Sequence, residues 1–328
     1  MKIFLTTSEG TKEITNMVTD ATLSGDYQTA ARTLKFGVVS NYNDKSIPVI
    51  KCDLGSGIVM TEKGENIFNG FIYSREKSTD DSIINVTCYD RGIYLKRNQA
   101  VYKVNSTPEQ MVKRICYDFG LRAGKIAETG VNINRKFIGC SLLDIIQTLY
   151  TIASEKTGKK YVIRFEDNLL CIAERSEEVV LSIDGQKNLI NAVTSESAEN
   201  LVDCVVVYDK DENFINSFKN DENIKLLGLM QRHLKKGDDE DAAEKAKKIL
   251  EDNDISRKIT VNNIGNIKCI SGNAVTVREP YTGLNGLFYI DSDVHTWKNG
   301  QYYNKLTLNF KKIMAEKSAG SEEKEKKK

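Results

Sequence analysis

The sequence predicts an α+β fold that is mainly β, with two duplicated small β-barrel modules and a helix-rich unit between them. The first observation is a strand–turn–strand pattern that occurs twice. Gly57 and Gly70 mark the first copy, and Gly272 and Gly286 mark the second, so the glycines lie 13 and 14 residues apart. The second observation is that hydrophobic residues follow a helical period in the middle third and alternate as in strands on either side of it. These patterns indicate that one arrangement of β-strands occurs twice in the chain.

Changes in pattern also give the expected domain boundaries. At 328 residues the chain is longer than one hydrophobic core usually supports. The predicted parts are an N-terminal arm (1–32), a first barrel module (33–95), a helix-rich unit (96–175), a second barrel module (176–312) with a helical insertion (235–252), and a disordered charged tail (313–328).

The first module is predicted from short strands bounded by Gly, Asn, Asp or Ser, which favour turns. Several such strands within one short stretch of chain are typical of a small barrel or sandwich. The predicted strands are residues 34–38, 49–54, 58–60, 67–73 and 83–89, and the arm before them contains a further candidate at residues 2–6.

The helix-rich unit begins with a capped helix. Thr107 is a good N-cap, Pro108 suits the first helical position, and Gln110 can complete a capping box. Apolar residues then recur at helical spacing until Gly120, which is predicted to end the helix.

A second helix is predicted to begin at Ser141 and to end at Gly158. Two short apolar runs follow it, separated by Asp167-Asn168. This dipeptide favours a tight turn, so the runs predict a hairpin that completes the unit.

Beyond residue 176 the strand pattern returns. The apolar run at residues 202–208 is interpreted as the counterpart of residues 34–39, and residues 225–231 are predicted as a strand. The insertion contains one helix at residues 242–252. Residues 317–328 are almost entirely Lys, Glu, Ser, Gly and Ala, a composition that predicts disorder.

Composition excludes several functional classes. The 47 basic and 46 acidic residues leave a net charge of +1, which argues against a strongly basic nucleic-acid-binding surface. The seven cysteines form no CxxC pair, so we expect reduced, buried thiols in a chain made in a reducing cytosol. No apolar run has the length of a signal peptide or a membrane span, and we expect no membrane insertion.

Asp291, Asp293 and His295 form the sharpest chemical constellation in the sequence. Alternate side chains on a strand share a face, so two carboxylates and an imidazole could converge on a metal ion. The same residues also fit a solvated hairpin, and the other histidine, His233, lies in a different segment. We therefore favour the structural interpretation over the metal site.

Other chemistries have weaker support. A Ser or Cys nucleophile would need His295 as its base across a distance that the sequence does not show. Residues 156–160 lack the first glycine and the final Ser/Thr of a phosphate loop, and they end a helix where such a loop begins one. A single-strand nucleic-acid groove could be formed by aromatic and basic residues, for which the candidates are Tyr89, Tyr94, Lys96, Arg97 and Tyr102. We assign no catalytic, cofactor-binding or metal-binding residues.

A series of segments, in order, resembles one known family. The chain is similar to the late-control D-like and XkdQ-like hub proteins at the baseplate of contractile phage tails and phage-tail-like bacteriocins. No single motif is specific, but the series covers roughly residues 20–312. The segments that carry the resemblance are residues 24–36, 68–72, 88–98, 141–146, 157–161 and 286–300.

The resemblance implies a non-enzymatic homotrimer whose two tube-like barrels per chain adapt a six-fold tail tube to a three-fold central spike. It also implies several partners in the virion or tail-like particle. These are a second copy of the chain, the tail tube protein, the spike protein and neighbouring baseplate (wedge) proteins, with the tape measure protein as a further candidate. Two alternatives from other classes stay open: a peptidoglycan-degrading baseplate enzyme, and a barrel protein that binds single-stranded nucleic acid.

Overall fold

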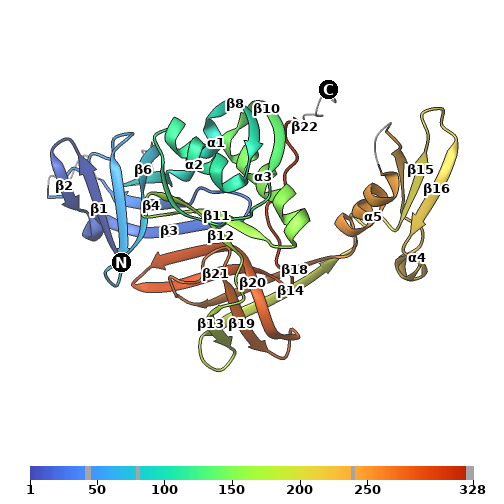
Figure 1. Ribbon diagram of the computed structural model, residues 1–328. Coiled ribbons are helices and arrows are strands. Elements are labelled where there is room, and N and C mark those ends of the chain that lie inside the picture. Colours follow the sequence, from blue (N-terminus) through green and yellow to red (C-terminus); the bar gives the residue numbers. More distant parts are fainter. Residues whose placement is uncertain (41–45, 79–81, 238–240, 323–328) are drawn as a thin grey trace. The chain divides into compact units, whose positions relative to one another are not determined.

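The computed structural model describes residues 1–40, 46–78, 82–237 and 241–322 (Figure 1). The chain forms two compact units. The main unit comprises Met1–Ala192 and Thr260–Lys328, and the inserted unit comprises Val193–Ile259. Strands far outnumber helices in the described residues, which confirms the mainly β class.

The first repeat consists of antiparallel strands packed on one core. Its elements are β1 (Lys2–Thr7), β2 (Gly10–Glu13), the short 3-10 helix η1 (Thr15–Met17), β3 (Val18–Asp26), β4 (Thr33–Val39), β5 (Gly57–Glu62), β6 (Glu65–Lys77) and β7 (Ile83–Asp90). Across the sheet the order is β3-β4-β7-β6-β5-β1-β2. Residues 49–54, predicted as a strand, are not one, although Ile50 and Cys52 are buried there.

The second repeat uses the same order. Its strands are β13 (Val179–Asp184), β14 (Leu189–Ser197), β18 (Ser256–Ile264), β19 (Ala274–Glu279), β20 (Leu284–Lys298) and β21 (Gln301–Asn309). They lie in the order β14-β18-β21-β20-β19-β13, which reproduces β3-β4-β7-β6-β5-β1 strand for strand. The outermost pair differs, because β1 runs antiparallel to β5 whereas β13 runs parallel to β19. The duplication inferred from the sequence is therefore present in the topology.

A β-bulge occurs at the same place in both repeats. Between β6 and β7 the register shifts from Ile72 to Ser74, and between β20 and β21 it shifts from Ile290 to Ser292. Because a bulge re-aims the strand that carries it, its repetition identifies equivalent residues. Superposing the bulges makes Ile72 the counterpart of Ile290 and Ser74 the counterpart of Ser292.

Backbone hydrogen bonds at the bulge identify the equivalent glycines. The Gly55 N–H donates to the Ile72 carbonyl at 2.8 Å, and the Gly272 N–H donates to the Ile290 carbonyl at 3.0 Å. Both glycines have a positive φ, 82° and 96°. The structural counterpart of Gly272 is therefore Gly55, whereas the sequence pattern had aligned Gly272 with Gly57, two residues further along the chain. Since side chains alternate with a period of two, that error leaves the inward and outward pattern unchanged.

Residues 1–32 belong to the sheet and do not form the separate arm that was predicted. They contain β1, β2 and β3, and β3 pairs with both β4 and β20. Ile3, Leu5 and Leu23 are buried in the core of the first repeat. The Thr, Ser and Asp residues that suggested an arm alternate with these apolar residues, as the two faces of a strand require.

The helix-rich unit lies between the repeats in sequence and has its own core. Its elements are α1 (Gly92–Arg97), β8 (Gln99–Ser106), α2 (Pro108–Asp118), β9 (Arg122–Ile126), β10 (Ile133–Ser141), α3 (Leu142–Thr157), β11 (Tyr161–Glu166) and β12 (Leu169–Glu174). Thr107 and Gln110 form the predicted capping box at the start of α2. Ser141 caps α3, and Gly158 ends it with a φ of 72°. Both predicted helix starts are confirmed, as is the stop at Gly158.

The inserted unit is larger than the helical insertion predicted for residues 235–252. It contains β15 (Cys204–Tyr208), β16 (Phe214–Lys219), α4 (Asp221–Leu227), β17 (Gln231–Lys235) and α5 (Ala242–Asp252). β15 lies between β16 and β17, and α5 packs on this sheet through Ala246. Residues 202–208 are thus not the counterpart of residues 34–39, because β18 occupies that place. Residues 225–231, predicted as a strand, include the end of α4.

The first part of the predicted disordered tail packs against the main unit. Met314 is buried, and β22 (Ser321–Glu322) pairs with β10. The backbone N–H groups of Lys317 and Ala319 donate to the hydroxyls of Thr151 and Thr148 on α3, both at 3.0 Å. Main-chain hydrogen bonds thus hold a segment that has few apolar side chains. Residues 323–328 lie outside the described part of the chain.

The cysteines are free thiols, and all are buried except Cys140, which is half-buried. Burial raises the pKa of the Cys269 thiol to about 12 and that of Cys116 to about 11. Neutral thiols of this kind pack as small apolar groups. Among the described residues, no helix has both the length and the apolar character needed to cross a membrane.

Candidate functional site

The two repeats are joined by one pair of strands, which we call the joint. Residues 292–298 of β20 pair antiparallel with residues 20–26 of β3. The first half of β20 pairs with β19 within the second repeat, so one long strand belongs to both repeats. The joint holds the Asp293 and His295 side chains that the sequence singled out, together with the single tryptophan of the chain, Trp297.

Trp297 anchors the joint. It belongs to the second repeat, yet its side chain is buried in the core of the first. Its ring stacks on Tyr302 of β21, with centroids 4.4 Å apart and planes 9° apart. Its indole N–H donates to Glu62 Oε2 at 2.9 Å, and the Met1 amino group lies 3.0 Å from the same oxygen. The polar end of the ring therefore has a partner where it is buried.

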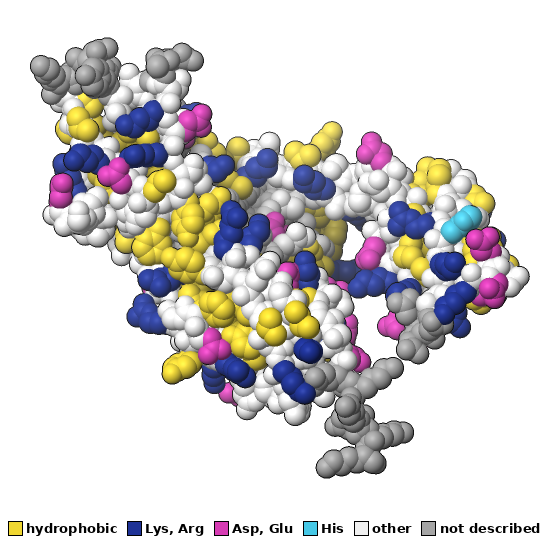
Figure 2. All heavy atoms as spheres, turned by 90° about the horizontal axis from the view of Figure 1, so that it is seen from above, with side chains coloured by type: hydrophobic (Ala, Val, Ile, Leu, Met, Phe, Trp, Pro, Cys, Tyr) yellow, Lys and Arg dark blue, Asp and Glu magenta, His cyan; other side chains and the backbone are white. Residues whose placement is uncertain are grey.

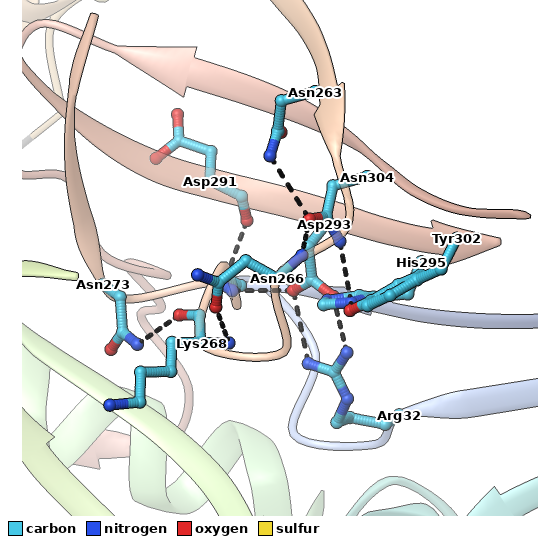
Figure 3. A network of polar contacts seen from close by, with 11 residues as sticks. Arg32, Asn263, Asn266, Lys268, Asn273, Asp291, Asp293, His295, Tyr302 and Asn304 are labelled. Atoms are coloured by element: carbon cyan, nitrogen blue, oxygen red, sulfur yellow. Dashed lines mark hydrogen bonds and ion pairs between the residues drawn. The ribbon is translucent and has the colours of Figure 1, made fainter. Parts of the chain in front are cut away.

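His295 is held by a buried amide network (Figure 3). Asn304 Oδ1 accepts from the Asn266 N–H at 2.6 Å, so the Asn304 amide nitrogen faces His295 Nδ1, at 2.8 Å. The Tyr302 hydroxyl is 2.7 Å from the same nitrogen. Two donors at Nδ1 favour the tautomer that carries its proton on Nε2. Nε2 lies 3.2 Å from Asp293 Oδ2, and this contact is not a full hydrogen bond.

Asp293 is fully buried and pairs with Arg32, which precedes β4 in the first repeat. The guanidinium makes a two-pronged contact, with Nη1–Oδ1 at 3.2 Å and Nη2–Oδ2 at 2.5 Å. The Ser271 N–H also donates to Oδ1, at 2.6 Å. Burial alone would raise the pKa of Asp293, but the Arg32 charge and the His295 contact outweigh it and lower this pKa to about 2. The ion pair thus links the repeats.

This pair predicts a specific acid sensitivity. A carboxyl whose pKa is lower in the folded state stabilises the protein above its unfolded pKa of 3.8, and that stabilisation is lost as the pH falls through about 2. The shift corresponds to about 2–3 kcal/mol. We expect the wild type to lose stability more steeply than Asp293→Asn between pH 4 and pH 2, measured by urea unfolding. Parallel curves for the two proteins would contradict the linkage.

Asp291 does not converge with Asp293 and His295. The bulge between Ile290 and Ser292 re-aims this part of β20, and the Asp291 carboxylate meets Arg175 instead, with both guanidinium nitrogens 3.3 Å from Oδ1. Asn309 donates to its other oxygen at 3.1 Å. No group of three His, Cys, Asp or Glu side chains suited to a metal ion occurs in the part of the chain that the structure describes. Each carboxylate of the proposed triad instead faces an arginine.

Asp90 orders the start of α1 beside Arg32. Its Oδ1 accepts from the Gly92 N–H at 2.8 Å and its Oδ2 from the Arg32 N–H at 3.1 Å. Burial raises the pKa of Asp90 to about 7, against the opposing effect of these N–H groups and of the Arg32 charge. Gly92 cannot carry a side chain, since a Cβ would lie 2.4 Å from the Ala30 carbonyl oxygen. This turn therefore connects the helix-rich unit to the end of β7.

A cavity of about 330 Å³ lies beside the joint, between the repeats and the β11–β12 hairpin. Three cationic residues line it, Arg32, Arg164 and Lys268, and the two arginines have the carboxylate partners Asp293 and Glu166 respectively. Arg164 also donates to Asn273 Oδ1 at 3.2 Å. These contacts connect the hairpin to the second repeat. Their arrangement is that of a structural junction.

The remaining sequence candidates lie on several different elements. The segment 156–160 ends α3, with Gly158 as its C-cap. Tyr102, offered as part of a nucleic-acid groove, is buried in the core of the helix-rich unit and donates to Asp118 at 2.7 Å. His233 is exposed on β17 of the inserted unit. The sequence did not indicate the roles of Arg32, Arg175 and Trp297, because their partners lie more than one hundred residues away.

Comparisons with known proteins agree with this fold. The XkdQ protein of the phage-like element PBSX of Bacillus subtilis (strain 168) is 23% identical over 305 residues, which cover 90% of this chain and 93% of that one. The 43 kDa tail protein of prophage MuSo2 from Shewanella oneidensis has a TM-score of 0.70 at 15% identity, with 94% of this chain and 97% of that chain covered.

A third likeness is more distant. A component of the type VI secretion system of E. coli, described as similar to T4 bacteriophage tail proteins, has a TM-score of 0.52 at 11% identity, with 93% of this chain and 76% of that chain covered. The model of the YQBQ-like family matches residues 21–309, which include both repeats, the joint, the helix-rich unit and the inserted unit. The chain therefore belongs to the YQBQ-like family and has the fold of phage tail proteins.

Proposed function

We propose that the chain is a structural hub of a contractile-tail baseplate and acts as a homotrimer. Two repeats per chain would give the trimer six similar positions. A tail tube with six-fold symmetry could bind one face of such a ring, and a spike with three-fold symmetry could bind the other. The chain would be made in the bacterial cytoplasm and would end in the baseplate of a phage or of a tail-like particle.

The observation that carries this proposal is the strand order that occurs twice in one sheet. A duplicated strand order alone is found in any protein that contains a tandem repeat of one domain. Here the two copies are also joined edge to edge through β3 and β20, as neighbouring members of a ring would be. Closed rings are a common solution for repeated edge-to-edge contacts, because closure leaves no open sheet edge.

Contacts with neighbouring baseplate proteins are assigned in this proposal to the parts that interrupt the repeats. In the first repeat a short connection joins β3 to β4. In the second repeat the equivalent strands, β14 and β18, are joined by the whole inserted unit. It exposes large apolar side chains that its own core does not use, namely Phe214, Leu226 and Leu229. Exposed apolar side chains on a small domain are frequent at protein–protein contacts.

A non-enzymatic role is supported by the way in which the charged groups of the joint are used. Asp293 and Asp291, the best candidates for chemistry, each have an arginine partner. A peptidoglycan-degrading activity would need a free carboxyl or nucleophile, and loss of such an activity in His295→Ala would overturn this part of the proposal.

The alternative of a nucleic-acid-binding protein would call for a continuous basic groove. Figure 2 shows Lys and Arg side chains scattered among apolar and acidic ones on the face drawn, without such a groove.

The experiment is a mass measurement by light scattering on the purified chain, alone and mixed with the spike protein of the same particle. We expect the mass of a trimer, either for the chain alone or in a complex that contains three chains per spike trimer. A chain that stays monomeric in both samples would overturn the hub proposal.

A further inference from the structure

We propose that residues 312–322 form a releasable strap, and that the surface beneath the strap is a binding site for an extended peptide. The strap follows the second repeat and ends with β22 at the edge of β10; it is drawn in red in Figure 1. The strap-binding surface consists of Arg135 on β10 and of Asp144, Thr148 and Thr151 on α3. The inference does not depend on the proposed trimer, because the strap and its surface both belong to the main unit of one chain.

Two threonines of α3 recognise the main chain of the strap. Thr148 and Thr151 lie one turn apart, and their hydroxyls accept from the backbone N–H groups of Ala319 and Lys317, both at 3.0 Å. Each hydroxyl also donates to the carbonyl four residues earlier in α3, at 2.7 and 2.8 Å, which leaves its oxygen free to accept from the strap. Backbone groups are common to all residues, so these contacts select an extended main chain and not one particular side chain.

Arg135 of β10 continues this recognition of the main chain. Its Nε donates to the Ala319 carbonyl at 2.6 Å, and its Nη2 donates to the Gly320 carbonyl at 3.2 Å. The N–H and the carbonyl of Ala319 therefore both have partners on the helix-rich unit. β22 then pairs antiparallel with β10 at two positions. Adding a strand to the edge of a sheet is a general way in which extended peptides bind to proteins.

Three positions of the strap define the side-chain pattern that the surface accepts. Met314 is buried and packs in the core of the helix-rich unit. Gly320 has a φ of 69°, and a Cβ at this position would lie 2.4 Å from the Lys136 carbonyl oxygen. Between them, the Lys317 ammonium lies 3.0 Å from the Asp144 carboxylate. A peptide that fits therefore has an apolar residue, then a basic residue and then a glycine, each three positions after the one before.

The strap can open while the elements beneath it stay folded. Met314 is the one buried residue of the strap, all of whose residues the structure describes, whereas most side chains of α3 are buried. Three ion pairs of the strap, made by Lys312, Glu316 and Lys317, join half-exposed or exposed side chains, so salt screens them. Segments with few buried apolar contacts open locally, at a lower free energy than global unfolding.

Release of the strap also changes the link between the helix-rich unit and the second repeat. The Ile313 carbonyl accepts from Arg175 Nη1 at 2.6 Å, and the same guanidinium binds Asp291 and the Ile290 carbonyl of β20. An open strap leaves Arg175 with its partners on β20 and uncovers the strap-binding surface. The strap is thus a latch, which a competing peptide of the same pattern displaces when it binds.

The first test is hydrogen exchange, followed by mass spectrometry, on the full wild-type chain. We expect the amide hydrogens of residues 312–322 to exchange at least about tenfold faster than those of residues 142–157, which form α3. Raising the NaCl concentration from about 0.05 M to about 0.5 M should speed exchange in the strap about fivefold, because its ion pairs are screened, and should leave α3 unchanged. A strap that exchanges as slowly as α3 at both salt concentrations would overturn its release.

The second test measures the binding of a fluorescent synthetic peptide, with the sequence of residues 312–322, to the full chain. The variant Met314→Asp/Gly320→Val removes two required side-chain features from the chain's own strap and leaves the strap-binding surface unchanged. We expect this variant to bind the peptide at least about tenfold more tightly than the wild type, because in the wild type the strap occupies the surface for most of the time. Equal affinity for the two proteins would overturn the binding site.

Two controls accompany the peptide measurement. Ser318→Ala changes an exposed residue of the strap and should bind the peptide as the wild type does. A peptide with Met314→Asp and Gly320→Val is the control ligand and should bind neither protein. If it binds as tightly as the native peptide, the binding is non-specific and the proposed site is overturned. Hydrogen exchange on the wild type decides the release of the strap even if the double variant fails to fold.

Discussion

Replacing Trp297 with alanine should lower the free energy of unfolding of the main unit by about 3–5 kcal/mol, the range measured for large aromatic side chains removed from a core. Trp297 is the group of the second repeat that enters the core of the first. Its removal leaves a cavity, unstacks Tyr302 and takes away one partner of the buried Glu62 carboxylate. Because the side chain links the repeats, the loss should weaken their attachment.

The measurement is urea unfolding followed by circular dichroism. In the wild type, fluorescence can be recorded in parallel, because Trp297 is the only tryptophan and reports the joint directly. Trp297→Phe keeps an aromatic ring but cannot donate to Glu62, so we expect an intermediate loss. Tyr281→Ala, on an exposed turn, should change the unfolding free energy by less than about 0.5 kcal/mol. A Trp297→Ala variant as stable as that control would refute the anchoring role.

The sequence predicted those features that depend on neighbouring residues. The capping box at Thr107 and Gln110 and the stop at Gly158 need only a few positions, and both are present. The duplicated strand–turn–strand pattern was also recognisable, because alternation survives a two-residue error in alignment. The mainly β class followed from these local patterns.

Features that depend on distant partners were not predictable. Residues 202–208 have the apolar pattern of a sheet strand, and that pattern does not say which sheet the strand joins, so β15 was placed in the second repeat although it belongs to the inserted unit. The sequence spacing of Asp291 and Asp293 predicts that their side chains lie on the same face of a strand. In the structure a bulge separates them, and each binds a distant arginine. The periodicity of apolar residues shows which face of a strand is buried, whereas the tertiary fold decides which residues pack against that face.

Replacing Arg175 with methionine should lower the unfolding free energy at neutral pH by about 3–5 kcal/mol, as expected when one member of a buried ion pair is removed. The Arg175 side chain is completely buried. Besides Asp291, it donates to the carbonyls of Ile313 at 2.6 Å and Ile290 at 2.7 Å. It therefore connects the end of the helix-rich unit to the second repeat and to the C-terminal segment. Methionine fills similar volume but leaves these acceptors and the Asp291 charge without their donor.

The pH dependence separates the lost charge pairing from lost packing. Burial already raises the pKa of Asp291 in the wild type, and removing the Arg175 charge should raise it further. A raised folded pKa means that stability is fully retained below the unfolded value of 3.8 and is lost as the pH rises through the folded value. The deficit of Arg175→Met relative to the wild type should therefore shrink toward pH 4. The double variant Arg175→Met/Asp291→Asn should recover part of the loss at pH 7, because no buried carboxylate is then left unpaired. A deficit that is the same at every pH and in the double variant would mean that Arg175 acts through packing and its carbonyl contacts alone.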